Sequence, residues 1–66
     1  MGEMKFEVHW AYKLKEDDLE KVEEILRRSY PGRLRLSTLD VLQAVDNADP
    51  ALHKRCHKAG ALEAYR

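Results

Sequence analysis

Hydrophobic and polar residues alternate in the first part of the chain. The apolar positions are Met4, Phe6, Val8, Trp10, Tyr12 and Leu14. A hydrophobic repeat of two indicates a β-strand with one buried face, and aromatic residues favour the same element. We therefore predict a strand over residues 4–13, whose apolar face turns toward the core.

The repeat then lengthens to that of a helix. The apolar positions on one helical face are Leu19, Val22, Ile25, Leu26 and Tyr30. This spacing predicts an amphipathic helix over residues 16–29. Its start is open, because a capping box at Asp17 competes with a hydrophobic staple from Leu14 to Leu19 around a cap at Lys15. Pro31, which cannot continue a helix, and the glycine that follows it end the segment.

Three further elements and a turn follow. Residues 33–36 alternate Arg and Leu, which predicts a short strand with both leucines inward. Ser37 is the N-cap of a predicted helix over 38–47, with an acid three residues later. Asp49 and Pro50 begin another helix over 50–59, which Gly60 ends. Residues 61–65 are predicted to form a C-terminal helical turn.

These elements give the order β-α-β-α-α in a single domain of residues 1–66, of the α+β class. We expect a two-stranded sheet, packed on three helices, with parallel and antiparallel pairing both open. A sheet of two strands is marginal by itself, and the long first strand has an edge to cover. A second copy of the chain could extend the sheet across a two-fold axis, so we expect a homodimer.

Charge divides the chain into two halves although the formal net charge is zero. Residues 1–26 are acidic on balance and residues 27–66 are basic. One cysteine cannot form an internal disulfide, which fits a reducing compartment, and no run is apolar enough for a membrane span. We therefore expect a cytoplasmic protein that does not contact a membrane.

The segment from Asp49 to Gly60 contains several side chains that can bind a metal ion or a phosphate. His53, Cys56 and His57 lie within about one turn of each other, and together with His9 they resemble a zinc ligand set. Their spacing matches no known zinc motif, and neighbouring Lys and Arg residues disfavour a cation. We interpret Cys56 as a small buried hydrophobe and predict no metal site.

A nucleic-acid interface is an alternative for the same segment. Helices 38–47 and 50–59 with a tight corner resemble a helix-turn-helix. The basic and imidazole side chains that would meet phosphates or base edges are Arg33, Arg35, His53, Lys54, His57 and Lys58. Against this, an acid and a proline begin the second helix, and the sequence pI near 6.8 is low for a nucleic-acid binder.

No catalytic or cofactor motif stands out, so we predict neither an enzyme nor a cofactor. The favoured function is a small protein–protein interaction module, which acts as an accessory or regulatory factor and self-associates. Trp10, Tyr12 and His9 on the first strand are the predicted partner-binding residues, because an apolar face too broad for the helices leaves such side chains for a partner.

Overall fold

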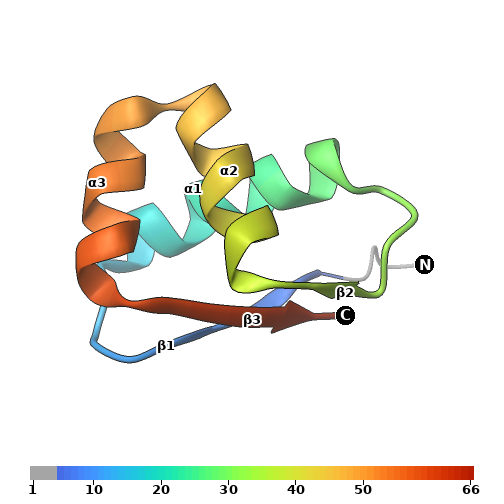
Figure 1. The fold of residues 1–66 in the computed structure, drawn as a ribbon, viewed down its shortest axis with the longest axis horizontal. Coiled ribbons are helices and arrows are strands. Elements are labelled where there is room, and N and C mark those ends of the chain that lie inside the picture. The colour runs from blue at the N-terminus through green and yellow to red at the C-terminus, as the bar shows by residue number, and fades with distance from the viewer. Residues whose placement is uncertain (1–4) are drawn as a thin grey trace.

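Three helices pack on one face of a three-stranded sheet in the computed structural model, which describes residues 5–66 (Figure 1). The elements in chain order are β1 (Glu7–Trp10), α1 (Glu16–Ser29), β2 (Arg35–Leu36), α2 (Thr38–Ala48), α3 (Pro50–Ala59) and β3 (Ala61–Tyr65). The predicted α+β class is confirmed. The predicted two-stranded sheet and the order β-α-β-α-α are wrong, because the last segment forms a third strand.

The third strand lies in the middle of the sheet. The strand order is β1-β3-β2, and β3 runs antiparallel to both neighbours. Val8 and Leu36 both lie opposite Ala64, one on each side. β1 and β2 are therefore parallel to each other without pairing, and within residues 5–66 each has one edge without a strand partner.

Residues 61–65 form β3 instead of the expected helical turn. Gly60 ends α3 in the left-handed conformation, with φ of 72°, and reverses the chain toward β1. Ala61 and Ala64 are buried in β3, three residues apart, because the register with β1 shifts by one residue between Val8 and Trp10. A β-bulge of this kind breaks the repeat of two by which a strand is recognised.

The two other strands are shorter than predicted. β1 ends at Trp10, and the next two residues bend and donate their backbone N–H groups to the carbonyls of Gly60 and Ala59 at 2.9 Å each. A strand extends only as far as its partner, and β3 starts at Ala61. Tyr12, predicted to face inward, is therefore 71% exposed. Met4, at the other end of the predicted strand, lies outside the described residues.

β2 contains two residues, where residues 33–36 were predicted to form a strand. Only Arg35 and Leu36 pair with β3, and Leu34 lies before the paired segment with 69% of its surface exposed. The prediction that Leu34 faces the core is wrong. Leu36 is fully buried as expected.

The helices begin and end close to the predicted residues because their caps are local. α1 begins after Lys15 without a side-chain cap, as the staple predicted. Ser37 and Asp40 form a reciprocal capping box at the start of α2, with hydrogen bonds of 3.2 and 3.3 Å. The Asp49 carboxylate accepts the first backbone N–H groups of α3.

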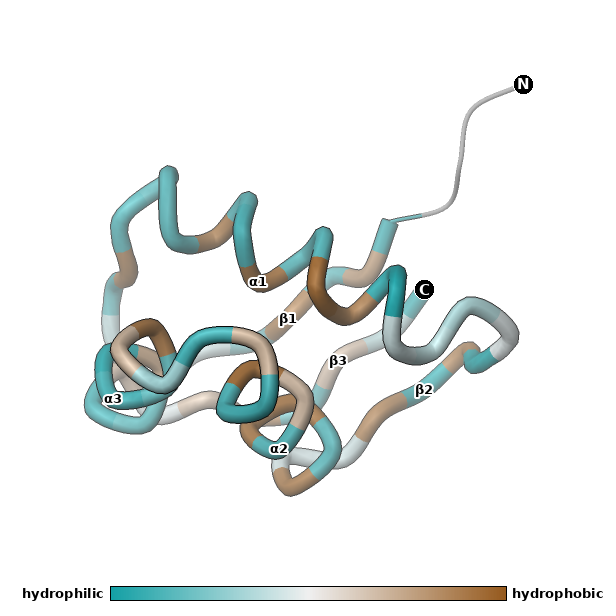
Figure 2. Tube along the Cα trace, turned by 90° about the horizontal axis from the view of Figure 1, so that it is seen from above, coloured by the Kyte–Doolittle hydropathy of each residue, from teal (hydrophilic) through white to brown (hydrophobic). Residues whose placement is uncertain are grey.

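The core lies between the helices and the inner face of the sheet. Its fully buried members come from every layer: Leu26, Leu36, Val41, Val45, Leu52, Cys56 and Ala64. Viewed from above, α1 crosses over β1, and α2 and α3 lie together on one side of α1 (Figure 2). None of the helices within residues 5–66 has the length and apolarity to cross a membrane.

Candidate protein-binding groove

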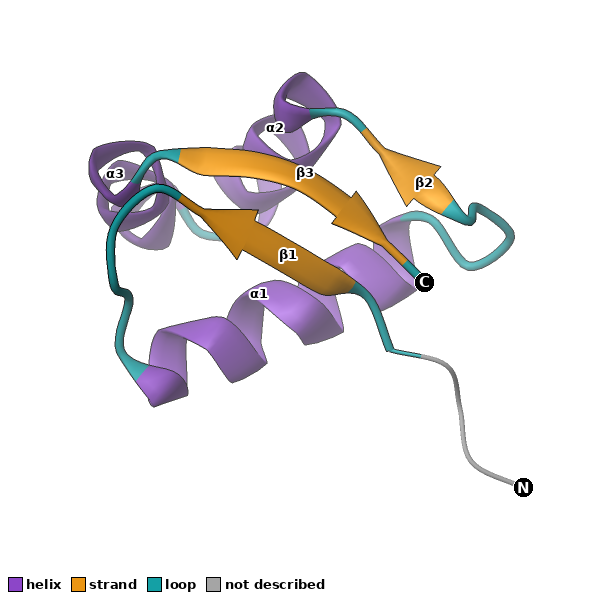
Figure 3. Ribbon diagram, turned by 90° about the horizontal axis from the view of Figure 1, so that it is seen from below, coloured by secondary structure: helices purple, strands orange, loops and turns teal. Residues whose placement is uncertain are grey.

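One helix extends past the free edge of the sheet. In the view from below, α1 crosses behind β1 at an angle, so that its N-terminal end lies on the side of β1 away from β3 (Figure 3). The loop of residues 11–15 connects the two elements. Because β1 pairs with β3 on its other side only, its outward backbone groups have no strand partner among the described residues.

A groove of about 440 Å³ separates β1 from α1. Its apolar lining comes from Phe6, Val8 and Trp10 of the strand segment and from Leu19 of the helix. Val8, Trp10 and Leu19 are only partly buried, so apolar surface remains uncovered beside unpaired backbone. An uncovered apolar groove beside an unpaired strand is what binding by strand addition requires. In that binding mode, hydrogen bonds from the backbone of the added peptide give affinity, and every second side chain of the peptide fills a pocket.

The rim of the groove is acidic. Glu7, Glu20 and Glu23 also line it, with Lys5 as its one basic residue. Lys5 Nζ lies 3.9 Å from Glu23 Oε1, and the Lys5 side chain is 70% exposed. An adjoining hollow of about 330 Å³ is lined by Lys5, Arg27 and three glutamates, including Glu24. Acidic groups thus outnumber basic ones along this edge.

The Trp10 side chain contributes an unpaired donor. Its indole Nε1 is enclosed, and no described residue accepts a hydrogen bond from it. Leaving a buried donor unpaired costs about 1–3 kcal/mol. Trp10 therefore lines the groove with the hydrogen-bond donor of its side chain unused.

The opposite face of the sheet has no helix over it (Figure 3). His9 and Tyr65 meet there edge to face, with ring centroids 5.7 Å apart. Leu62 and Glu63 complete a shallow hollow of about 280 Å³ with them. This face combines an aromatic pair with charge, and β1 and β3 build it.

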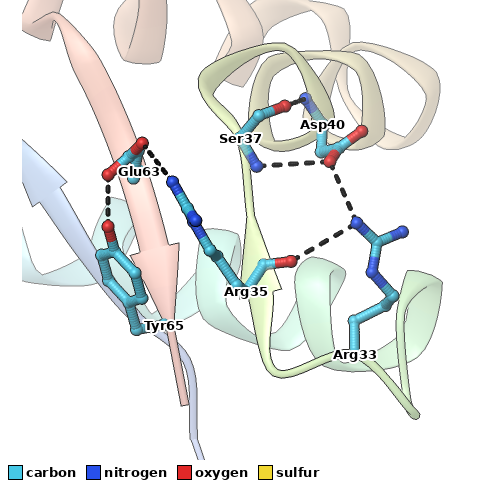
Figure 4. A network of polar contacts seen from close by, with 6 residues as sticks. All are labelled: Arg33, Arg35, Ser37, Asp40, Glu63 and Tyr65. Atoms are coloured by element: carbon cyan, nitrogen blue, oxygen red, sulfur yellow. Dashed lines mark hydrogen bonds and ion pairs between the residues drawn. The ribbon is translucent and has the colours of Figure 1, made fainter.

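Glu63 is the centre of a polar network on this face (Figure 4). Tyr65 Oη donates to Glu63 Oε1, and Arg35 donates to Glu63 Oε2 at 3.1 Å. The two donors, Tyr65 before Arg35, hold the pKa of Glu63 below its ordinary value. The same hydrogen bonds raise the pKa of Tyr65 and of Arg35. The Glu63 carboxylate therefore balances the positive charge of Arg35 within the chain.

The three predicted partner-binding residues lie in different places. Trp10 lines the groove. His9 points to the opposite face of the sheet and contacts Tyr65. Tyr12 lies in the bend after β1 and is exposed. These three residues therefore do not form one continuous surface. The glutamates that line the groove were not singled out in the sequence.

The predicted nucleic-acid-binding residues also separate into two groups. Arg33 lies 3.5 Å from Asp40, and Arg35 binds Glu63 (Figure 4). The remaining four lie on α3, where His53 Nδ1 is 3.8 Å from Asp46. These four are His53, Lys54, His57 and Lys58.

The corner before α3 is shorter than that of a helix-turn-helix. Asp49 alone separates α2 from α3, whereas that motif uses a turn of about three or four residues.

The histidines and the cysteine do not form a cluster. His53 and His57 lie with ring centroids 6.2 Å apart on α3, while Cys56 is fully buried in the core. His9 lies on the far face of the sheet against Tyr65. Within residues 5–66, no group of three or more His, Cys, Asp or Glu side chains is placed to hold a metal ion.

Comparison with known proteins gives no relative for this chain. No family model, no curated protein and no solved structure matches it.

Proposed function

We propose that this chain is a non-enzymatic protein–protein interaction module that binds an extended segment at the free edge of β1. The observation that carries the proposal is the apolar groove between β1 and α1, because it joins an unpaired strand edge to uncovered side chains. A binder of this kind needs no cofactor and acts as an accessory or regulatory factor. Its lone cysteine is a free, buried thiol, which supports a reducing, cytoplasmic location.

Two kinds of occupant fit the edge of β1. A second copy could pair its own β1 with this one and extend the sheet across a two-fold axis, which is the homodimer expected from the sequence. A strand from another protein could pair in the same way. Both would cover Val8 and Trp10.

A charge on the edge strand tests the proposal. Val8→Lys places an ammonium group beside the groove, a device by which edge strands resist pairing. Light scattering over a concentration series, and binding of extended peptides, should both show weaker association for Val8→Lys than for the parent. Circular dichroism establishes that the variant is folded. A folded variant that associates like the parent would refute a role for this edge.

A nucleic-acid-binding regulator using α2 and α3 is the second candidate. Lys54 and Lys58 are exposed on α3 and form no ion pair with a described residue. The pairing of Arg33 and Arg35 with acids weakens this candidate, because it removes two of the expected phosphate contacts. Counterion release requires affinity to fall steeply with salt. A mixed DNA or RNA pool that does not bind at low salt would exclude it.

A further inference from the structure

We propose that the groove between β1 and α1 selects a basic extended segment of another protein over a second copy of this chain. The inference rests on the proposed function and names the chemistry of its partner. The segment would add as a fourth strand beside β1, with alternate apolar side chains in the groove and Lys or Arg side chains at its rim.

The first argument is the shape of the site. β1 offers four residues of strand edge without a described strand partner, and the N-terminal end of α1 lies outside that edge (Figure 3). An incoming strand would direct every second side chain to the helix side of the sheet. Val8, Trp10 and Leu19 are there to receive these side chains.

The second argument is charge. Glu7, Glu20 and Glu23 line the groove, and only Lys5 opposes them there. The Lys5 side chain, already near Glu23, shows that this carboxylate attracts an ammonium group. The stems of Lys and Arg pack on apolar surface while their heads reach a polar rim. A basic segment would therefore satisfy both the groove and its rim.

The same charges disfavour a second copy. Pairing β1 with β1 across a two-fold axis places the α1 helix of each copy near that of the other. Each of these helices carries Glu20 and Glu23 on the groove side. Like charges brought together at an interface lower its stability and direct the choice of partner. The acidic rim thus favours a different chain with basic residues.

A short peptide serves as the probe. We would use a blocked nonapeptide with two lysines at each end and an alternation of valine and threonine between them. Trp10 is the only tryptophan, so its fluorescence reports directly on the groove. The basic peptide should shift the Trp10 emission to shorter wavelength, and raising the salt concentration should weaken binding. A version with glutamates at both ends should bind at least about tenfold more weakly.

Substitutions in the rim provide the matched test. Glu20→Gln combined with Glu23→Gln should weaken binding of the basic peptide about three- to tenfold, as expected for the loss of two ion pairs at the surface. Glu16→Gln is the control, because Glu16 is exposed on the same helix and does not line the groove. It should leave the affinity unchanged. Light scattering of the parent and of both variants records the oligomeric state.

The outcomes separate the inference from the proposed function. If the basic and acidic peptides bind equally, or the double variant binds like the parent, the inference is wrong and the binding edge stands. The same holds if light scattering shows a dimer that must dissociate before the peptide binds. If no peptide changes the Trp10 emission and the chain is a monomer at all concentrations, both proposals fail.

Discussion

Gly60 and Ala11 lie so close together that a side chain on Gly60 has no room. A Cβ atom built on Gly60 would lie 2.7 Å from the Cβ of Ala11, and Gly60 has a φ of 72°. The Ala11 N–H donates to the Gly60 carbonyl at 2.9 Å. This contact fixes the point at which α3 ends, β3 begins and β1 leaves the sheet.

Gly60→Ala should therefore destabilise the fold by more than about 1 kcal/mol, because left-handed backbone strain adds to a steric clash. Gly32→Ala is the control, since nothing lies within 4 Å of a Cβ there. Urea unfolding measures both. Adding Ala11→Gly to Gly60→Ala should recover part of the loss by removing the clash. Equal stability of Gly60→Ala and Gly32→Ala would contradict the importance of the contact.

A buried carboxylate joins α1 to α3. Asp18 is 5% exposed and accepts two hydrogen bonds from Arg55, at 2.9 and 3.2 Å. The hydrogen bonding that Arg55 donates to Asp18 is also the main reason that the pKa of Arg55 is raised. Two-point geometry of this kind needs a guanidinium, because an ammonium group cannot present two parallel donors.

Replacing Arg55 should thus lower the urea midpoint of unfolding clearly more than replacing an arginine of an exposed ion pair. Arg55→Ala leaves Asp18 buried without its partner, and Arg55→Lys should restore only part of the loss. Arg28→Ala is the matched control, because the Arg28–Glu24 pair is exposed on both sides and such helix pairs contribute about 0.3–0.5 kcal/mol. A midpoint for Arg55→Ala that equals that of Arg28→Ala would show the buried pair to be dispensable.

The helices could be predicted from the sequence because their signals are local. Ser37, Asp49 and Gly60 each act within a few residues of a helix end, and each has the predicted role. β3 could not be predicted in this way. Ala, Leu and Glu in residues 61–65 favour a helix by propensity, and the bulge disturbs the alternation of apolar positions. Only pairing with β1 and β2, which are distant in sequence, makes this segment a strand.

The candidate groove was predictable only in part. Trp10 was expected to bind a partner because a long apolar strand face needs more cover than short helices give. Glu20 and Glu23 were indistinguishable from any polar helix face, since their significance depends on where α1 lies relative to β1. Asp18 likewise shows no signal in the sequence. Its partner Arg55 is 37 residues away along the chain.

Ionisation of the Cys56 thiol should lower the stability of the fold at alkaline pH. The pKa of its thiol is raised from 9.0 to about 11, mainly by burial; the Asp18 carboxylate contributes to this rise and Arg55 opposes it. The folded state therefore retains the thiol proton at pH values where the unfolded chain loses it. The stability that this provides is fully present below about pH 9 and is lost as the pH rises toward 11.

We expect the free energy of unfolding to fall by up to about 2–3 kcal/mol over this interval, at about 1.4 kcal/mol per pKa unit. The measurement is the urea midpoint from pH 8 to pH 11. Cys56→Ala is the control, because it lacks the thiol and keeps every other side chain. The difference in urea midpoint between the parent and Cys56→Ala should become smaller as the pH rises. A constant difference would show that the thiol does not titrate differently on folding.

Ala64 tests whether β3 is the central strand. Its side chain is fully buried, and its strand neighbours are Val8 and Leu36. Ala64→Leu should cost about 1–3 kcal/mol, because the extra atoms have no space beneath the helices. Leu62→Ala, at a position that is 46% exposed, should cost much less. If residues 61–65 were a solvent-exposed helical turn, Ala64→Leu would be tolerated. Urea unfolding of the two variants therefore distinguishes the strand from the turn.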